Sequence, residues 1–116
     1  MTMTREVPLD PEASALLTID VQNFSCKREG GEFSHLSDAE FDRDFGWYMD
    51  RIWSETIPNI ARLEKGFRAK GIEVMHTTIE SLTLDGRDRS LDYKITGFNV
   101  PKGSWDGQVV DEIAPE

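Results

Sequence analysis

"ALLTIDVQNFSC" (residues 15–26) begins as a run of apolar and β-branched residues and stops abruptly at Asp20. A short continuous apolar run is typical of a strand covered on both faces, as in a parallel sheet. We therefore predict a strand over residues 14–21. Its carboxyl end places Asp20 where open α/β sheets bind their ligands. The alternative interpretation of Asp20, from position alone, is an aspartate that caps a turn or a following helix.

A helical pattern follows the first strand over residues 45–70. Its apolar residues recur at three- and four-residue steps: Ile60, Leu63 and Phe67. Pro58 is expected to kink this stretch or to begin a second helix within it, and Gly71 is expected to end it with a left-handed cap. The β-branched run "IEVMHTTI" (residues 72–79) then predicts a second strand. Strand, helix and strand together make a parallel βαβ unit with a right-handed crossover.

The remaining segments are polar and carry turn signals. Residues 23–44 are rich in Gly, Ser and charge, and we expect a long loop there. Residues 80–107 are also expected to be loop-like. A last short helix is predicted over residues 107–114, capped by Ser104 or Asp106.

Two parallel strands make too small a sheet to stand alone, because parallel strands are normally covered on both faces and flanked by neighbours. The expected fold class is α/β: a three-layer, Rossmann-like parallel sheet with helices on both faces, incomplete in this chain. Residues 1–116 would be the N-terminal part of a single domain. A second polypeptide is expected to carry the remaining strands, and the assembled protein is expected to be a homo-oligomer.

Composition excludes several classes of partner. The 22 acidic residues against 13 basic ones give a net charge of -9, which repels nucleic acid and anionic membrane surfaces. No apolar run approaches the roughly 20 residues that span a bilayer, and the N-terminus has charges and prolines where a signal peptide needs an apolar stretch. The single cysteine cannot form an internal disulfide. A cytoplasmic protein without nucleic-acid or membrane partners is therefore expected.

The segment "LLTIDVQNFSC" resembles the opening strand of the isochorismatase-like cysteine hydrolases, which include nicotinamidases, N-carbamoylsarcosine amidases and ureidoacrylate amidohydrolases. The residues that fall on the family's pattern are Asp20, Gln22, Asn23 and Cys26. Phe24-Ser25 stands where the family usually has Asp-Phe. Farther along, "IPNIARLEKGFRAKGIEVMHT" looks like the family's Pro-Asn-Ile helix and second strand, and "GSWDGQVVDEIAPE" looks like its Gly-x-x-Gly…Glu-(Leu/Ile)-x-Pro segment.

The resemblance implies a hydrolase that cleaves the C–N bond of a small amide or ureido substrate through a cysteine thioester, without a cofactor. Asp20 would be the general base and proton carrier. On this alignment the family's lysine and nucleophilic cysteine lie past Glu116, so they are expected outside this chain. Lys102 does not match the family's lysine, and Cys26 is expected to be a packing residue rather than the nucleophile.

Candidate substrate-binding residues lie in two places. Gln22 and Phe24 belong to the motif of Asp20 and are expected in the pocket wall. Arg87 and Arg89 form a small basic group after the second strand. One interpretation of these arginines is a solvated turn. The other is a lid that binds a substrate carboxylate bidentately, with Tyr93 closing over a substrate that releases ammonia.

Other chemistries are weaker fits to the sequence. His35 lies near Asp38 and Asp42, but one histidine among scattered carboxylates falls short of a metal site, and no metal is expected. His76 is expected to be a hydrogen-bonded core histidine. Alternatives within the same fold are an isochorismate-type vinyl-ether hydrolase and a non-catalytic interaction module. A phosphoacceptor or phosphatase domain would need a second carboxylate near Asp20 to hold Mg²⁺, and "DVQNF" offers none.

Overall fold

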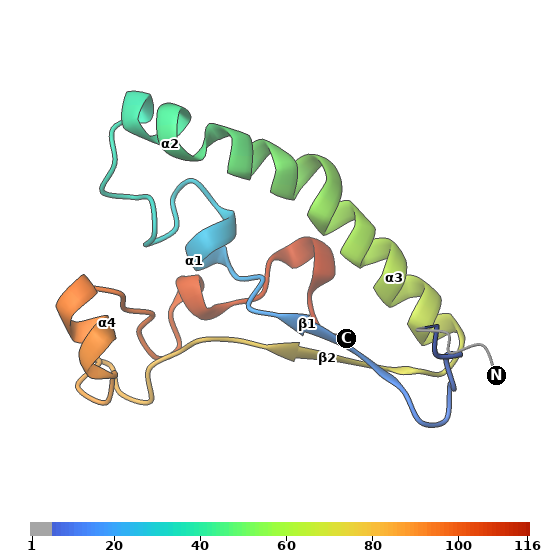
Figure 1. Cartoon of the computed structure of the whole chain (residues 1–116). Coiled ribbons are helices and arrows are strands. Elements are labelled where there is room, and N and C mark those ends of the chain that lie inside the picture. The colour runs from blue at the N-terminus through green and yellow to red at the C-terminus, as the bar shows by residue number, and fades with distance from the viewer. Residues whose placement is uncertain (1–5) are drawn as a thin grey trace.

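The structure is a computed structural model that describes residues 6–116, and it is a mixed α/β arrangement (Figure 1). Two short strands lie below one long helical rod, and the short helices of residues 23–26, 91–96 and 105–107 lie beyond the carboxyl ends of the strands. In chain order the elements are β1 (Ala15–Ile19), α1 (Asn23–Cys26), α2 (Asp38–Arg51), the π-helical turn η1 (Ile52–Thr56), α3 (Ile57–Ala69), β2 (Glu73–Thr77), α4 (Leu91–Thr96), and the 3-10 turns η2 (Trp105–Gly107) and η3 (Asp111–Ile113).

Strands β1 and β2 pair in parallel, as the sequence predicts. Ala15 lies opposite Glu73, and Ile19 lies opposite Thr77. Both strands are shorter than the predicted ranges. β1 ends at Ile19 because Asp20 turns into the left-handed region with φ 56°. A left-handed residue cannot continue the extended pleat of a strand.

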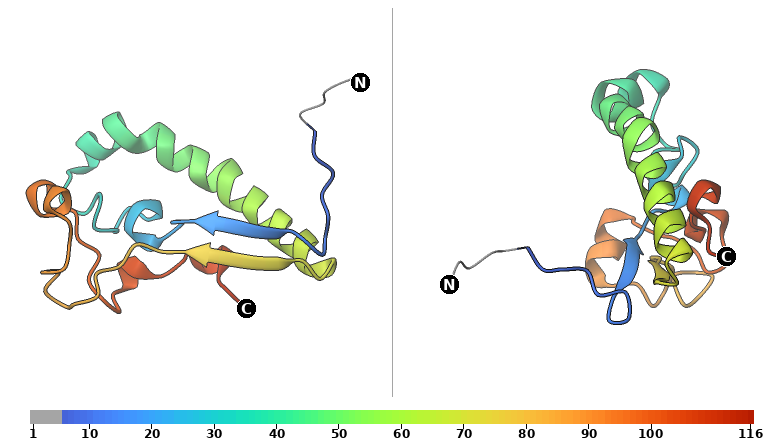
Figure 2. Two further views of the ribbon diagram at one scale, coloured as in Figure 1. Left: turned by 60° about the horizontal axis from the view of Figure 1, so that its bottom comes forward. Right: turned by 90° about the vertical axis from the view of Figure 1, so that its right-hand side faces the viewer.

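The two faces of this sheet have different environments. Thr18 is buried on the face that packs against α3. On the opposite face the side chains are open: Leu17, Ile19 and Met75 are 46%, 63% and 40% exposed. Figure 2 shows the α2–α3 rod running along one side of the strands. Within residues 6–116 there is one helical layer and one sheet layer, so the expected three-layer arrangement is not confirmed.

The helical rod begins earlier than predicted. Ser37 caps α2 with a full capping box: its hydroxyl oxygen accepts from the main-chain N–H of Glu40 at 3.3 Å, and the Glu40 carboxylate accepts from the N–H of Ser37 at 2.9 Å. The expectation of a loop as far as residue 44 was therefore wrong, although Ser-Asp-Ala-Glu is a recognisable capping sequence. Pro58 lies in the first turn of α3, directly after the π-helical turn, and so begins a second helical segment as predicted.

Gly71 ends α3 as the sequence predicts. Its φ is +70°, its N–H donates to the carbonyl of Arg68 at 2.9 Å, and the N–H of Ile72 donates to the carbonyl of Phe67 at 3.0 Å. This pair of bonds is a Schellman motif, which satisfies the last carbonyls of the helix.

Gly71→Ala is expected to lower the free energy of unfolding by about 1–2 kcal/mol, because an added Cβ meets open space but the left-handed backbone is unfavourable for alanine. Gly66→Ala is the matched control: Gly66 lies inside α3 with equally open space around it, and alanine there should stabilise by up to about 1 kcal/mol. Denaturant unfolding of both variants measures the difference. Equal effects at the two positions would contradict the cap.

Residues 108–110 are extended where a helix was expected, and beyond them only the 3-10 turn η3 of the predicted range is helical. Val109 forms an antiparallel bridge with Gln22, and the N–H of Val110 donates to the carbonyl of Val21 at 3.2 Å. Val110 is fully buried in an apolar cluster with Cys26, Ile57 and Ile113. The prediction of a helix over residues 107–114 was wrong because two β-branched valines pair with the chain that follows β1. Conversely, α4 forms within the predicted loop, capped by Ser90.

Candidate active site

Asp20 lies at the carboxyl end of β1 in a constrained backbone position. Among the described residues it is the one non-glycine with positive φ, a conformation that costs roughly 1–2 kcal/mol for most side chains. Its N–H donates to the carbonyl of Thr77 at 3.0 Å, and its carbonyl accepts from the N–H of Gln22 at 3.1 Å. The Thr77 hydroxyl donates to Asp20 Oδ1 at 2.9 Å. The neighbouring strand thus fixes both the turn and the carboxylate.

A cavity of about 130 Å³ adjoins Asp20. It brings together three residues that the sequence placed in the site, together with others from distant segments. Its lining residues are Asp20, Gln22, Phe24, Ser25, Glu32, Ile79, Phe98 and Val100. Four of these eight residues are apolar, and the two carboxylates come from the end of β1 and from the loop after α1.

Gln22 positions this cavity through main-chain contacts. Its amide nitrogen donates to the carbonyl of Ile79 at 2.9 Å, and its amide oxygen accepts from the N–H of Ile79 at 2.6 Å. The same nitrogen also lies 3.3 Å from the carbonyl oxygen of Gly107. Gln22 is buried and joins the extension of β2 to the 3-10 turn η2. Its hydrogen-bonding groups are thus directed to the main chain rather than to a substrate.

An aromatic row forms the far wall. The Phe24 and Phe98 rings lie 4.7 Å apart between centroids, and the Phe98 and Tyr93 rings lie 4.4 Å apart and are stacked. Phe98 borders the cavity of Asp20 on one side and a hollow of about 190 Å³ on the other, which Tyr93 and Arg89 also line. No pattern in the sequence singles out Phe98, an isolated aromatic residue in a polar segment.

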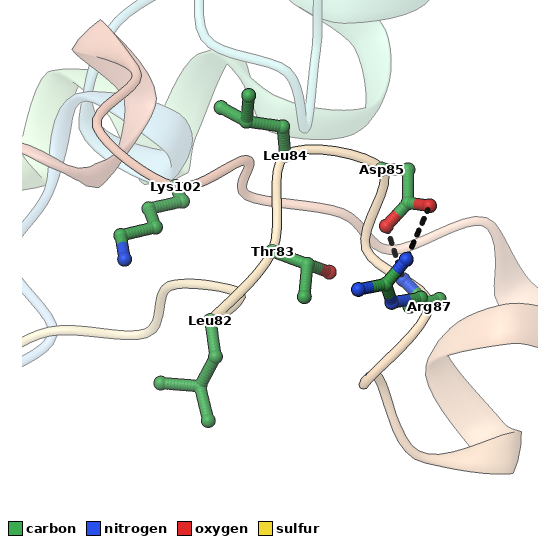
Figure 3. A pocket seen from close by; sticks show the side chains of 6 residues that line it. All are labelled: Leu82, Thr83, Leu84, Asp85, Arg87 and Lys102. Carbon is green, nitrogen blue, oxygen red and sulfur yellow. Dashed lines mark hydrogen bonds and ion pairs between the residues drawn. The ribbon is translucent and has the colours of Figure 1, made fainter.

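The two arginines occupy different places. Arg89 donates from Nε to the carbonyl of Gly86 at 2.9 Å and from Nη1 to the carbonyl of Phe98 at 2.8 Å, so it holds the aromatic row in position. Arg87 is exposed, and its Nη1 lies 3.9 Å from an oxygen of Asp85. It lines a separate open hollow of about 650 Å³ with Leu82, Thr83, Leu84, Asp85 and Lys102 (Figure 3). The structure does not bring Arg87 into the cavity of Asp20.

Asp88 organises the loop that carries these arginines. Its carboxylate accepts from the N–H of Leu82 at 2.7 Å and from the N–H and hydroxyl of Thr83 at 3.2 and 2.5 Å. These hydrogen bonds, the Thr83 hydroxyl foremost, lower the pKa of Asp88 from 3.8 to about 2. The carboxylate form is therefore the one that holds the loop.

The loop should keep its form in mild acid. Because the folded pKa of Asp88 lies below the unfolded value, its contribution is present above about pH 4 and is lost as the pH falls through about 2. An NMR titration of the Asp88 carboxyl carbon should give a midpoint near 2, and the amide signals of Leu82 and Thr83 should shift with it. In Asp88→Asn those amide shifts should be absent. A midpoint near 3.8 would contradict the proposed hydrogen bonding.

Cys26 and His76 lie in the interior, as the sequence predicts. Cys26 is 3% exposed within the apolar cluster around Val110, and burial raises the pKa of its thiol. A buried, protonated thiol is a poor nucleophile. The Nε2 atom of His76 lies 2.9 Å from Oε1 of Glu64. Within residues 6–116 no group of three or more His, Cys, Asp or Glu side chains is placed to hold a metal ion.

Comparison with protein-family models and with curated proteins finds no match to this sequence. None of the helices within the described part of the chain is long and apolar enough to cross a membrane.

Proposed function

We propose that this chain supplies the catalytic aspartate, Asp20, of a hydrolase that cleaves the C–N bond of a small amide or ureido substrate through a cysteine thioester. The observation that carries the proposal is the backbone of Asp20. A non-glycine residue held by Thr77 in the left-handed region, at the end of a parallel strand and lining a cavity, is the kind of conformational outlier that clusters at functional sites.

In this mechanism the Asp20 carboxylate takes the proton of the attacking thiol. Oδ1 accepts the Thr77 hydrogen bond, so Oδ2 is the oxygen that receives the proton. The thiolate adds to the substrate carbonyl, and Asp20 returns the proton to the leaving nitrogen as the C–N bond breaks. A water molecule, deprotonated by the same carboxylate, then hydrolyses the thioester and restores the thiol.

The nucleophilic cysteine and a charge-stabilising lysine belong, in this proposal, to a second polypeptide that completes a three-layer domain. Support comes from the sheet: its open face exposes Leu17, Ile19 and Met75, and apolar strand faces of this kind are normally covered. Each strand pairs on one edge only in the described residues, which leaves a place for further strands. In this proposal the completed protein is a cytoplasmic homo-oligomer.

The test is release of ammonia from a panel of small amides and ureido compounds by the protein purified with the polypeptide that completes its sheet. Hydroxylamine should convert the thioester intermediate to a hydroxamate, which reports the covalent step separately. Cys26→Ser should retain most activity, because this thiol is buried in the apolar cluster. Absence of both ammonia and hydroxamate would contradict the proposal, and inactivation by Cys26→Ser would overturn the assignment of the nucleophile.

A further inference from the structure

Glu32 contributes a second carboxylate to the cavity of Asp20. Its main-chain N–H donates to the carbonyl of Phe24 at 3.3 Å, which ties its position to α1. Its side chain lines the cavity of Asp20 and also a hollow of about 400 Å³ on the other side of Phe24 and Phe98. Among the described residues, the Glu32 carboxylate makes no hydrogen bond and no ion pair. It is therefore available to a bound molecule.

The charges around the cavity are unbalanced. Asp20 and Glu32 line it, and no Lys, Arg or His of residues 6–116 does so. Arg89 lines the adjoining hollow, on the far side of Phe98, and two of its donor groups are bound to carbonyl oxygens. The net charge of -9 adds a field that attracts cations and repels anions.

The aromatic wall fits the same kind of ligand. Phe24 is buried, and its ring lies against that of Phe98 at an angle of 56°, so ring surface and carboxylate border one small space. The π face of an aromatic ring attracts a cation, and the attraction grows when the pair is shielded from water. An anionic group in this cavity would face carboxylates and the negative side of the rings.

We infer, resting on the hydrolase function proposed above, that the substrate carries a positive charge on the part remote from the scissile bond. Glu32 is the counter-ion of that group, and the Phe24 and Phe98 rings hold the body of the molecule. Asp20 transfers the proton at the scissile C–N bond, at the other end of the substrate. This substrate class differs from the carboxylate-bearing one that the two arginines suggested in the sequence, because the cavity at Asp20 contains neither of them.

The test uses benzamidinium, benzamide and benzoate, which share size and shape and carry charges of +1, 0 and -1. Their dissociation constants are measured by calorimetry or NMR titration with the assembled protein. Benzamidinium should bind about tenfold tighter than benzamide, the effect of one charge-assisted hydrogen bond, and benzoate should bind weakest. Glu32→Gln should abolish the cation preference and leave benzamide binding unchanged. Glu29→Gln, an exposed glutamate outside the cavity, should leave all three affinities unchanged.

The results separate this inference from the hydrolase proposal, because binding requires no turnover. A preference for benzoate, equal affinities, no binding of any probe, or a cation preference that survives Glu32→Gln would overturn it. Loss of the preference in Asp20→Asn but not in Glu32→Gln would overturn the role of Glu32. A Glu32-dependent preference in a protein that releases no ammonia would support the cation site and contradict the hydrolase proposal. Ammonia release without the preference would support the hydrolase proposal and contradict the cation site.

Discussion

Asp20→Asn is expected to lower kcat of the assembled protein by roughly 10²-fold or more while leaving the fold intact. Asparagine keeps the shape of the side chain and still accepts the hydrogen bond from the Thr77 hydroxyl. It also tolerates the left-handed backbone, in which Asn and Asp are enriched. What the amide loses is the ability to take a proton, so the effect isolates acid–base catalysis from structure.

The measurement is kcat and kcat/KM on the best amide or ureido substrate, with circular dichroism and denaturant unfolding as checks on the fold. Asp20→Ala serves as a comparison, because alanine removes the proton acceptor and also the Thr77 hydrogen bond in an unfavourable backbone region. It should lose both activity and stability. Activity of Asp20→Asn within a few fold of wild type would remove Asp20 from the mechanism.

If Asp20 were only a capping residue, Asp20→Asn would not be expected to lower kcat. A capping aspartate accepts a hydrogen bond from an N–H in the first turn of the next helix. Here α1 begins after Gln22, and its N-terminus receives no side-chain cap, while the Asp20 carboxylate accepts from Thr77. The structure therefore gives this carboxylate no capping bond whose loss would explain a large effect of Asp20→Asn.

The parts of the fold that the sequence predicted well are those set by local pattern. The apolar runs around Leu17 and Val74 and the helical spacing that ends at Gly71 each carry their own signal, and the parallel pairing of the strands follows from the helix between them. The position of Asp20 at a strand end follows from the same pattern. Its left-handed φ does not, because it depends on hydrogen bonding to Thr77 across the sheet.

The parts that the sequence missed depend on contacts between distant segments. Val109 pairs with Gln22, and the Phe98 ring packs at a tilt against that of Phe24, across more than seventy residues in each case. Neither pairing has a local pattern. In the sequence Glu32 is one of several charged residues in a polar loop, and only the structure shows that it lines the same cavity as Asp20. The capping sequence at Ser37 is different, since its signal was present and was outweighed by the polar composition around it.

Glu64 is a buried carboxylate whose burial the local sequence pattern does not predict, because glutamate in an amphipathic helix normally lies on the exposed face. It is 1% exposed and packs between α3 and the sheet. Its Oε1 accepts from the Thr18 hydroxyl at 3.2 Å and lies 2.9 Å from His76 Nε2, and its Oε2 lies 3.4 Å from Arg68 Nη1. One carboxylate thus joins both strands to the helix above them.

Glu64→Ala is expected to lower the free energy of unfolding by about 3–5 kcal/mol, because it leaves the polar groups of Thr18 and His76 buried without their partner. Small domains are stable by only about 5–15 kcal/mol, so much of the protein should be lost to unfolding. Glu64→Gln keeps one acceptor oxygen for Thr18 or His76 and should cost clearly less. Lys65→Ala, the exposed neighbour on α3, should change stability by no more than about 0.5 kcal/mol. Denaturant unfolding of the assembled protein ranks the variants, and a loss below about 1 kcal/mol for Glu64→Ala would show that this network does not join the helix to the sheet.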